Sequence, residues 1–143
     1  MSLPTDIRAH NRKLIEEFRA AGRQLEGRQL LLLTTTGART GQRHTTPMMY
    51  VPDGDRLLVF ASNAGAPRHP HWYRNLVAHP EVTVEVSGEA YEATAQVTTG
   101  AERDRLFART IEKYPFFADH QAQIKRKIPV VALVRAGHRG GPD

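Results

Sequence analysis

The chain has 143 residues, of which 40% are hydrophobic and 24% charged, a composition typical of one soluble globular domain. It contains no cysteine, which excludes disulfide bonds, thiolate metal sites and a cysteine nucleophile. The formal net charge of +5 indicates an anionic partner. No apolar run approaches the roughly 18 residues of a membrane-spanning helix.

The first element expected along the chain is an amphipathic helix that is capped by Asp6 and ends before Gly27. Strands are then expected over 29–36 and 45–51, and Pro47 marks a bulge or a sheet edge in the second of them. Asp53-Gly54 predicts a type I′ hairpin turn into a third strand over 56–62.

The second half of the chain begins with a short helix expected over 71–78. Alternating valines and alanines predict strands over 82–86 and 91–97, joined by a turn at Ser87-Gly88. Thr99 and Glu102 have the spacing of a capping box and predict the start of a helix that ends at Tyr114. A further short helix through Ile124 and a strand over 128–134 complete the order.

Six mainly antiparallel strands and non-alternating helices do not form βαβ units. They predict an α+β fold, a closed or partly closed β-barrel with peripheral helices. We expect one domain over residues 1–136 and a disordered glycine-rich tail over 137–143.

Positive charge is concentrated in three windows without Asp or Glu, over 27–52, 56–80 and 120–142. Such segregation predicts a focused patch that attracts anions, and a generally basic surface is the alternative. The turn Gly37-Ala38-Arg39-Thr40-Gly41 lies in the first window. It is neither a Walker A loop nor a GxGxxG fingerprint. Its amides and its arginine suit a phosphate or carboxylate, and a plain connecting loop is an equal alternative.

The stretch LLLTTTGARTGQRHTTPMMYVPDGDRLLVFASNAGAPRHPHWYRNL resembles the deazaflavin-dependent nitroreductase family. That family has a TTTGRKTG…TP segment, an Asp-Gly hairpin and an AS-x-x-GAP-x-x-P-x-WY-x-N-L segment in this order. The later segments AHPEVTVEV, YP and IPVV match too, so the resemblance extends over about residues 30–134. It implies a split β-barrel related to flavin-reductase and pyridoxamine-oxidase-like barrels. It also implies coenzyme F-420, a deazaflavin with a phosphate and a polyglutamate tail, as the anionic partner.

The resemblance further implies which residues contact this cofactor. The turn would approach the phosphate, the second strand would run along the cofactor, and a strand end, a helix start and one late aromatic residue would complete the pocket. These residues are Ala38, Arg39, Thr40, His44, Thr45, Thr46, Pro47, Met48, Met49, Phe60, Ala61, Ser62, Asn63, His71, Trp72, Tyr73, Arg74, Asn75 and Phe117.

This sequence departs from the family pattern at positions that are often basic, where it has Ala38, His44 and Asn63. Phosphate binding would then depend on Arg39, with three arginines as substitutes: Arg43, Arg68 and Arg74. Met49 and His120 stand where the best-studied nitroreductases of the family have tyrosines near the substrate, which argues against nitroimidazole reduction as the natural role.

The implied reaction is hydride transfer from reduced coenzyme F-420 to a small acceptor such as a quinone, an enone or a nitro compound. Tyr50, Ser62 and Tyr114 are candidate donors that would stabilise or protonate the acceptor oxygen. Each has a structural alternative, packing within a strand or a hydrogen bond at a strand end.

Two other functions fit parts of the sequence, an FMN-binding barrel of the same broad fold and a basic nucleic-acid-binding module without catalysis. The second lacks a helix-turn-helix or RNP signature and has only 7% aromatic residues, so no nucleic-acid partner is expected. No metal is expected either, because His69 and His71 lack a recognised ligand spacing and no carboxylate lies near them.

The N-terminus has no signal-peptide pattern, which predicts a cytoplasmic protein. The basic residues of its first helix would allow peripheral contact with an anionic membrane surface, whereas Glu16 and Glu17 favour a solvated helix packed on the barrel. A homodimer is a further alternative for the assembly.

Overall fold

The computed structural model describes residues 3–25, 27 and 29–136, so the predicted disordered tail lies outside the described residues. The elements are α1 (Leu3–Ala20), β1 (Leu30–Thr36), β2 (Arg43–Met49), β3 (Val51–Asp53), β4 (Arg56–Phe60), the 3-10 turn η1 (Asn63–Gly65), α2 (His71–Ala78), β5 (Glu81–Val86), β6 (Glu89–Val97), α3 (Gly100–Lys113), α4 (Phe116–Ala122) and β7 (Val130–Arg135).

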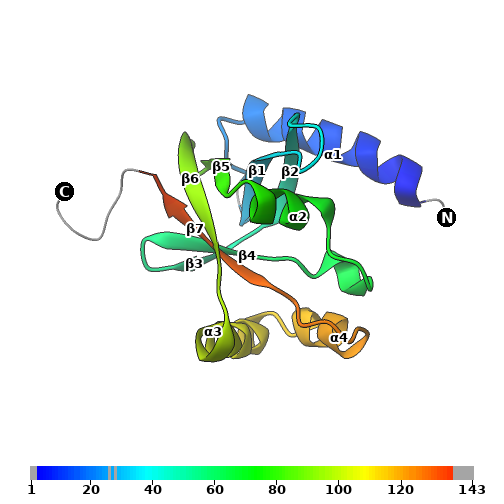
Figure 1. Cartoon of the computed structure of the whole chain (residues 1–143). Helices are drawn as coiled ribbons and strands as arrows, with labels where there is room; N and C mark the ends of the chain where they lie inside the picture. Colours follow the sequence, from blue (N-terminus) through cyan, green and yellow to red (C-terminus); the bar gives the residue numbers. More distant parts are fainter. Residues whose placement is uncertain (1–2, 26, 28, 137–143) are drawn as a thin grey trace.

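The described strands form one antiparallel sheet in the order β2-β1-β5-β6-β7-β4-β3. Its two edge strands, β2 and β3, follow each other in the chain and are separated only by Tyr50. The sheet must therefore curl until its two edges meet, which makes it a split barrel (Figure 1). The predicted α+β barrel with peripheral helices is confirmed.

The expected strand over 45–51 is wrong in one respect, because the chain changes partners at Tyr50. Residues before it pair with β1 and residues after it pair with β4. The Tyr50 amide donates to the Gln29 carbonyl over 3.3 Å, and Gln29 Nε2 donates to the Tyr50 carbonyl over 2.8 Å. Pro47 lies opposite Leu32 in regular register, so β2 is the edge strand that proline tolerates and has no bulge.

Three local predictions about turns and caps are also wrong. The β3–β4 hairpin has Gly54 and Asp55 as its loop residues, and of these two Gly54 has the positive φ, 64°. This fits a type II′ turn rather than type I′. Thr99 precedes α3 without a side-chain cap, because Glu102 accepts a hydrogen bond from Arg56 over 2.9 Å instead of closing a capping box. The first helix begins at Leu3, so Asp6 lies within it and not at its cap.

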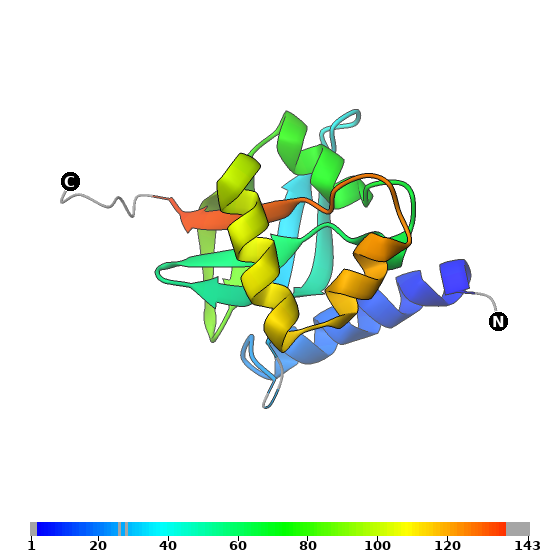
Figure 2. The same cartoon turned by 90° about the horizontal axis from the view of Figure 1, so that it is seen from below.

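The core has layers on both faces of the sheet, because the four leucines of β1 alternate between them. Leu31 and Leu33 pack inside the barrel beneath α2, and Leu30 and Leu32 pack outside against α1. A third cluster packs beneath α3 and α4, which lie together across the strands in Figure 2.

The described apolar residues of α1 pack on the barrel, where Leu14 and Phe18 contact β1. Arg19 and Arg23 of the same segment pair with the buried Glu85 of β5, at 2.7 and 3.1 Å. The alternative in which the helix packs on the barrel is thus the one observed. None of the helices in the described part of the chain is long and apolar enough to cross a membrane.

Candidate functional site

The glycine turn, the start of β2 and the first turns of α2 surround a cavity of about 380 Å³, which we call the turn cavity. It is lined by Gly37, Ala38, Arg39, Thr40, His44, His71, Arg74 and Asn75. All of these except Gly37 belong to the predicted cofactor contacts. The fold therefore brings together residues that are 38 positions apart in sequence, from Gly37 to Asn75.

Asn75 holds the turn against α2. Its side chain is buried, its Nδ2 donates to Thr35 Oγ1 over 3.1 Å, and its Oδ1 accepts the Ala38 amide over 3.0 Å. Gly37 donates to the Gln42 carbonyl over 2.7 Å to close the turn. A Cβ at Gly37 would lie 2.8 Å from Thr40 Oγ1, so only glycine fits there without a shift. Asn75 is thus a support of the turn as well as part of its cavity.

The free donors of the turn are fewer than the sequence suggested. The Ala38 amide is used by Asn75, and the Gly41 amide donates to the Gly37 carbonyl over 3.0 Å. Among the described residues, the amides of Arg39 and Thr40 have no hydrogen-bond partner within the protein. The sequence led us to expect free amides throughout the turn, but only the amides of Arg39 and Thr40 are free to bind an anion among the described residues.

Two guanidinium groups complete the polar wall of the turn cavity. In the described part of the chain, neither Arg39 nor Arg74 has a carboxylate within salt-bridge distance. The rings of His44 and His71 lie edge to face, with centroids 6.3 Å apart. No carboxylate among the described residues lines the cavity. Its charge is therefore positive and uncompensated, as an anion site requires.

Of the three arginines named as substitutes, Arg74 lines the turn cavity and the other two do not. Arg43 donates to the hydroxyls of Thr36 and Thr83 over 2.9 and 2.7 Å, and so ties β2 across to β5. Arg68 lies in the loop after β4, where its carbonyl accepts from Asn63 Nδ2 over 2.9 Å.

The far end of β2 borders a second cavity of about 340 Å³, which we call the Met49 cavity. It is lined by Gly27, Gln29, Leu30, Met49 and Tyr114. Between the two cavities, Thr45, Thr46, Pro47 and Met48 lie half-buried along β2. The predicted donor Tyr114 is thus close to the predicted cofactor strand.

The remaining predicted residues lie elsewhere. Tyr50 packs half-buried against the core, and neither it nor Ser62 lines the turn cavity or the Met49 cavity. Phe117 is buried against Phe60, with ring centroids 4.8 Å apart. Ala61 and Trp72 are core residues, Asn63 is exposed, and Tyr73 faces another cavity. Contact of these residues with the cofactor stays a prediction.

Sequence reasoning missed Arg126, which holds the loop after β4. Its guanidinium donates to the carbonyls of Ala61, Ser62, Ala66, Pro67 and Arg68 and contacts His69 Nδ1, over 2.9 to 3.1 Å. Burial lowers the pKa of Arg126 from its ordinary value. In the sequence it stands in a Lys-Arg-Lys run that is typical of a solvated surface, so no local signal distinguished it.

The curled antiparallel sheet defines a split-barrel protein, and among the described residues its turn cavity is lined by two arginines and by no carboxylate. The chain belongs to the F420H(2)-dependent quinone reductase family, whose model matches residues 7–135. It is 41% identical over 108 residues to the F420H(2)-dependent quinone reductase Rv1261c of Mycobacterium tuberculosis, covering 73% of this chain and 72% of that protein. A second relative, the putative F420H(2)-dependent quinone reductase Rv3178 of the same organism, is 32% identical over 103 residues, which cover 72% and 87% of the two chains.

Solved structures agree with this membership. An F420-H2-dependent reductase, FDR-A, superposes with a TM-score of 0.67 at 36% identity, covering 74% of this chain and 94% of that one. A domain-swapped dimer superposes with a TM-score of 0.70 at 33% identity, covering 91% and 98%. The haem storage protein HutZ of Vibrio cholerae, at 18% identity and a TM-score of 0.60, shares the fold alone.

The predicted oxidoreductase class and deazaflavin cofactor are confirmed by the family. The chain is an F420-dependent oxidoreductase. The two other functions considered for the sequence, an FMN-binding barrel and a nucleic-acid-binding module, are not the ones that its family indicates.

Proposed function

We propose that the protein reduces a quinone with reduced F420 and that the turn cavity holds the anionic end of the cofactor. One observation carries the proposal: Arg39 and Arg74, from separate elements, line the same carboxylate-free cavity and lack an anionic partner among the described residues. Like charges that line one cavity repel each other, and a bound phosphate would relieve this repulsion.

The donors present fit a phosphate or a carboxylate. The guanidinium groups of Arg39 and Arg74 supply charge, and the amides of Arg39 and Thr40 supply short, fixed donors. Asn75 keeps the turn in place through the Ala38 amide. The protein's part at this end is to bind and orient an anion.

We infer that the acceptor approaches at the opposite end of β2. His44 and Met49 are five residue steps apart along the extended strand, a span of about 17 Å. Bound reduced F420 supplies a hydride to the acceptor. Leu30 and Met49 provide an apolar wall that excludes water, and the Tyr114 hydroxyl is the candidate donor to the acceptor oxygen.

The proposal is tested by mixing the protein with reduced F420 and following reoxidation by menadione. We expect acceleration by the wild type. Arg39→Ala and Arg74→Ala should each raise the apparent dissociation constant of the cofactor by at least about tenfold, because a charge-assisted contact contributes roughly 1.5–3 kcal/mol.

Arg105→Ala is the matched control. Arg105 is exposed on α3 and lines neither the turn cavity nor the Met49 cavity, so its loss should leave the cofactor constant unchanged. Equal constants for wild type, Arg39→Ala and Arg74→Ala would show that the phosphate binds elsewhere.

We further infer that two copies of the chain associate. The support is the 33% identical neighbour described as a domain-swapped dimer, which covers 91% of this chain. Light scattering coupled to gel filtration should give twice the mass of one chain, 16.0 kDa. A single-chain mass at micromolar concentration would refute the inference.

A further inference from the structure

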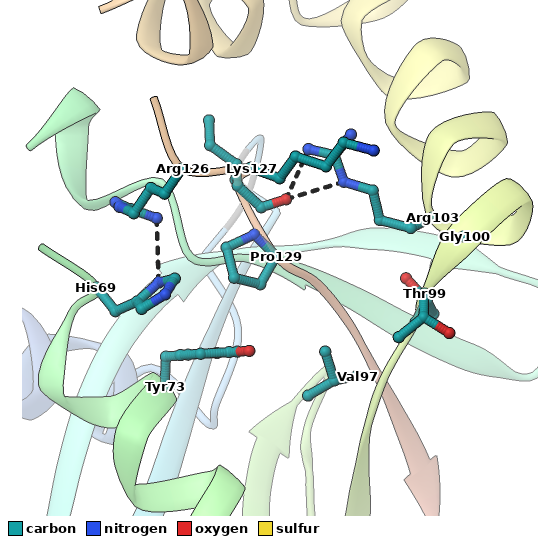
Figure 3. A pocket seen from close by; sticks show the side chains of 11 residues that line it. His69, Tyr73, Val97, Thr99, Gly100, Arg103, Arg126, Lys127 and Pro129 are labelled. Atoms are coloured by element: carbon teal, nitrogen blue, oxygen red, sulfur yellow. Dashed lines mark hydrogen bonds between the residues drawn. The ribbon is translucent and has the colours of Figure 1, made fainter. Parts of the chain in front are cut away.

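A third cavity of about 350 Å³ lies between the end of β6, the start of α3, the segment before β7 and the outer side of α2 (Figure 3). We call it the α3 cavity. It shares no lining residue with the turn cavity: His71, Arg74 and Asn75 of α2 line the turn cavity, whereas Tyr73 lines this one. Its volume is in the range of small-molecule sites, about 300–1,000 Å³.

One part of the wall is apolar and suits a flat hydrocarbon group. Val97, Ile128 and Pro129 contribute aliphatic surface, and the ring of Tyr73 contributes an aromatic face. Tyr73 is itself supported by the ring of His69, with centroids 4.6 Å apart. In Figure 3 the Tyr73 hydroxyl points into the space between Pro129 and Val97.

The polar part of the wall consists of donors. His69 Nδ1 faces Arg126 Nη1 at 3.1 Å and must accept from it, which leaves the ring proton on Nε2. The pKa of His69 is lowered, mainly by burial and further by the positive charges of Arg126 and Arg74. The ring therefore stays neutral, with its proton on Nε2. Burial raises the pKa of Tyr73, so its hydroxyl keeps its proton. Among the described residues, neither His69 Nε2 nor the Tyr73 hydroxyl has a hydrogen-bond partner.

Three cationic side chains also line the cavity, and they differ in how fully other groups of the protein already bind them. Arg126 is bound to loop carbonyls. Arg103 is 8% exposed and donates to the Ile128 carbonyl over 2.8 and 3.1 Å. Lys127 contacts only Asp104 among the described residues, at 3.2 Å, and both side chains are largely exposed, so this pair contributes little and is easily exchanged. Asp104 also contacts Arg103 at 3.1 Å but does not line the cavity.

The start of α3 borders the cavity and offers one backbone donor there, the Gly100 amide, which has no acceptor among the described residues. Thr98, Thr99 and Gly100 line the cavity. The Arg103 amide donates to the Thr99 carbonyl over 3.3 Å and makes the first hydrogen bond of the helix. In the described part of the chain, the amides of Gly100, Ala101 and Glu102 have no such acceptor and Thr99 does not cap them; Gly100 lines the cavity, and the other two follow it in the first turn.

We propose that the α3 cavity binds a small organic carboxylate with an apolar, preferably aromatic, body. The carboxylate would lie toward Lys127 and the first turn of α3, and the body would lie against Tyr73, Val97 and Pro129. A lining of donors without a carboxylate selects for an acceptor group, and the apolar wall excludes a bare inorganic anion as the preferred occupant. The site is independent of the cofactor proposal, because it lies on the other side of α2.

Benzoate is the probe. Titrated into ¹⁵N-labelled protein, it should shift the amide resonances of Gly100, Ala101 and Glu102 with a dissociation constant of about 1 mM, as expected for so small a molecule. Neutral benzamide, which has the same shape, should bind at least several-fold more weakly. Absence of shifts at these amides, or equal binding of benzamide, would overturn the proposal.

Lys127→Gln and Lys125→Gln form a matched pair, because both remove one exposed charge and only Lys127 lines the cavity. Lys127→Gln should raise the benzoate dissociation constant roughly three- to tenfold, and Lys125→Gln should leave it unchanged. Equal effects would indicate non-specific attraction and refute the site.

A last titration in saturating oxidised F420 separates the two proposals. We expect the benzoate shifts to persist. Competitive displacement would mean that the α3 cavity belongs to the cofactor site, which also refutes a separate site. If benzoate does not bind, the cofactor-binding result for Arg39→Ala still stands. If Arg39→Ala binds the cofactor normally, the benzoate result still stands.

Discussion

Replacing Arg126 with alanine tests how the loop that follows β4 is held in place. This loop contains left-handed residues in succession, Asn63, Ala64 and Gly65, with φ values of 50°, 54° and 82°. Such a backbone costs free energy at residues other than glycine and persists only where other contacts impose it. The contacts here are the bonds from the half-buried Arg126 to the loop carbonyls.

The size of the effect follows from the burial of these bonds. Three of the carbonyl acceptors, Ala61, Ser62 and Ala66, are in partly buried contacts. At roughly 1 kcal/mol each they contribute about 3 kcal/mol, whereas the exposed bonds add little. Relaxation of the left-handed Ala64 returns about 1 kcal/mol of this, whereas asparagine adopts such a φ at little cost. We therefore expect Arg126→Ala to lower the free energy of unfolding by about 2 kcal/mol, and Tm by roughly 4–10 °C.

Urea denaturation measures this difference directly, provided that the slope with denaturant stays the same. Arg126→Lys keeps the charge but reaches fewer carbonyls, so it should lose at least half as much. Arg105→Ala, an exposed arginine, should change the free energy of unfolding by less than about 0.5 kcal/mol. If Arg126→Ala were as stable as Arg105→Ala, the loop would be held by other contacts and the reasoning would be refuted.

Two further predictions concern buried polar groups. Asn75→Ala should lower the free energy of unfolding by about 1–3 kcal/mol, because it leaves the buried Thr35 hydroxyl without its donor. It should also weaken F420 binding, because it releases the turn. A variant with wild-type stability in thermal melting and wild-type affinity in a cofactor titration would contradict this. The second prediction concerns Glu85, whose pKa lies below its usual range. Hydrogen bonds from Arg19 are the main cause, and they outweigh the opposing effect of burial. The ion pair therefore stabilises the folded state at pH values above the ordinary pKa of a glutamate side chain. This stabilisation is lost as the pH falls below that value and through the lowered pKa of Glu85. Glu85→Gln should be less stable than wild type at pH 7, and the gap should close in acid; a gap independent of pH would refute the assignment.

The order of the elements could be predicted because it depends on local patterns. Alternation in 82–86 and 91–97 and the leucine run before the glycine turn indicate strands whatever surrounds them. The helix over 71–78 was predicted with the bounds that it has in the fold. Local patterns failed where a residue distant in sequence binds a side chain that the pattern needs. Arg56, for example, donates a hydrogen bond to Glu102, which therefore does not form the expected capping box.

Part of the candidate site could likewise be predicted from the sequence, and part of it could not. The acid-free windows and the family pattern were enough to indicate the turn, Arg39 and Arg74. They did not indicate that the Ala38 amide is already used by Asn75, or that Arg43 serves the sheet rather than the cavity. These facts depend on which hydrogen-bond acceptors lie near a donor in space.

The barrel class and the acid-free basic segment around the glycine turn follow from the order of amino acids, and the family resemblance adds the residues that surround the turn. The role of Arg126 does not follow from that order, because its acceptors lie about sixty positions earlier in the chain. The α3 cavity does not either, because its wall comes from three separate stretches of the chain. Strand and helix patterns arise from neighbours in the chain, whereas a cavity and a buried guanidinium depend on segments that meet only when the sheet curls and closes.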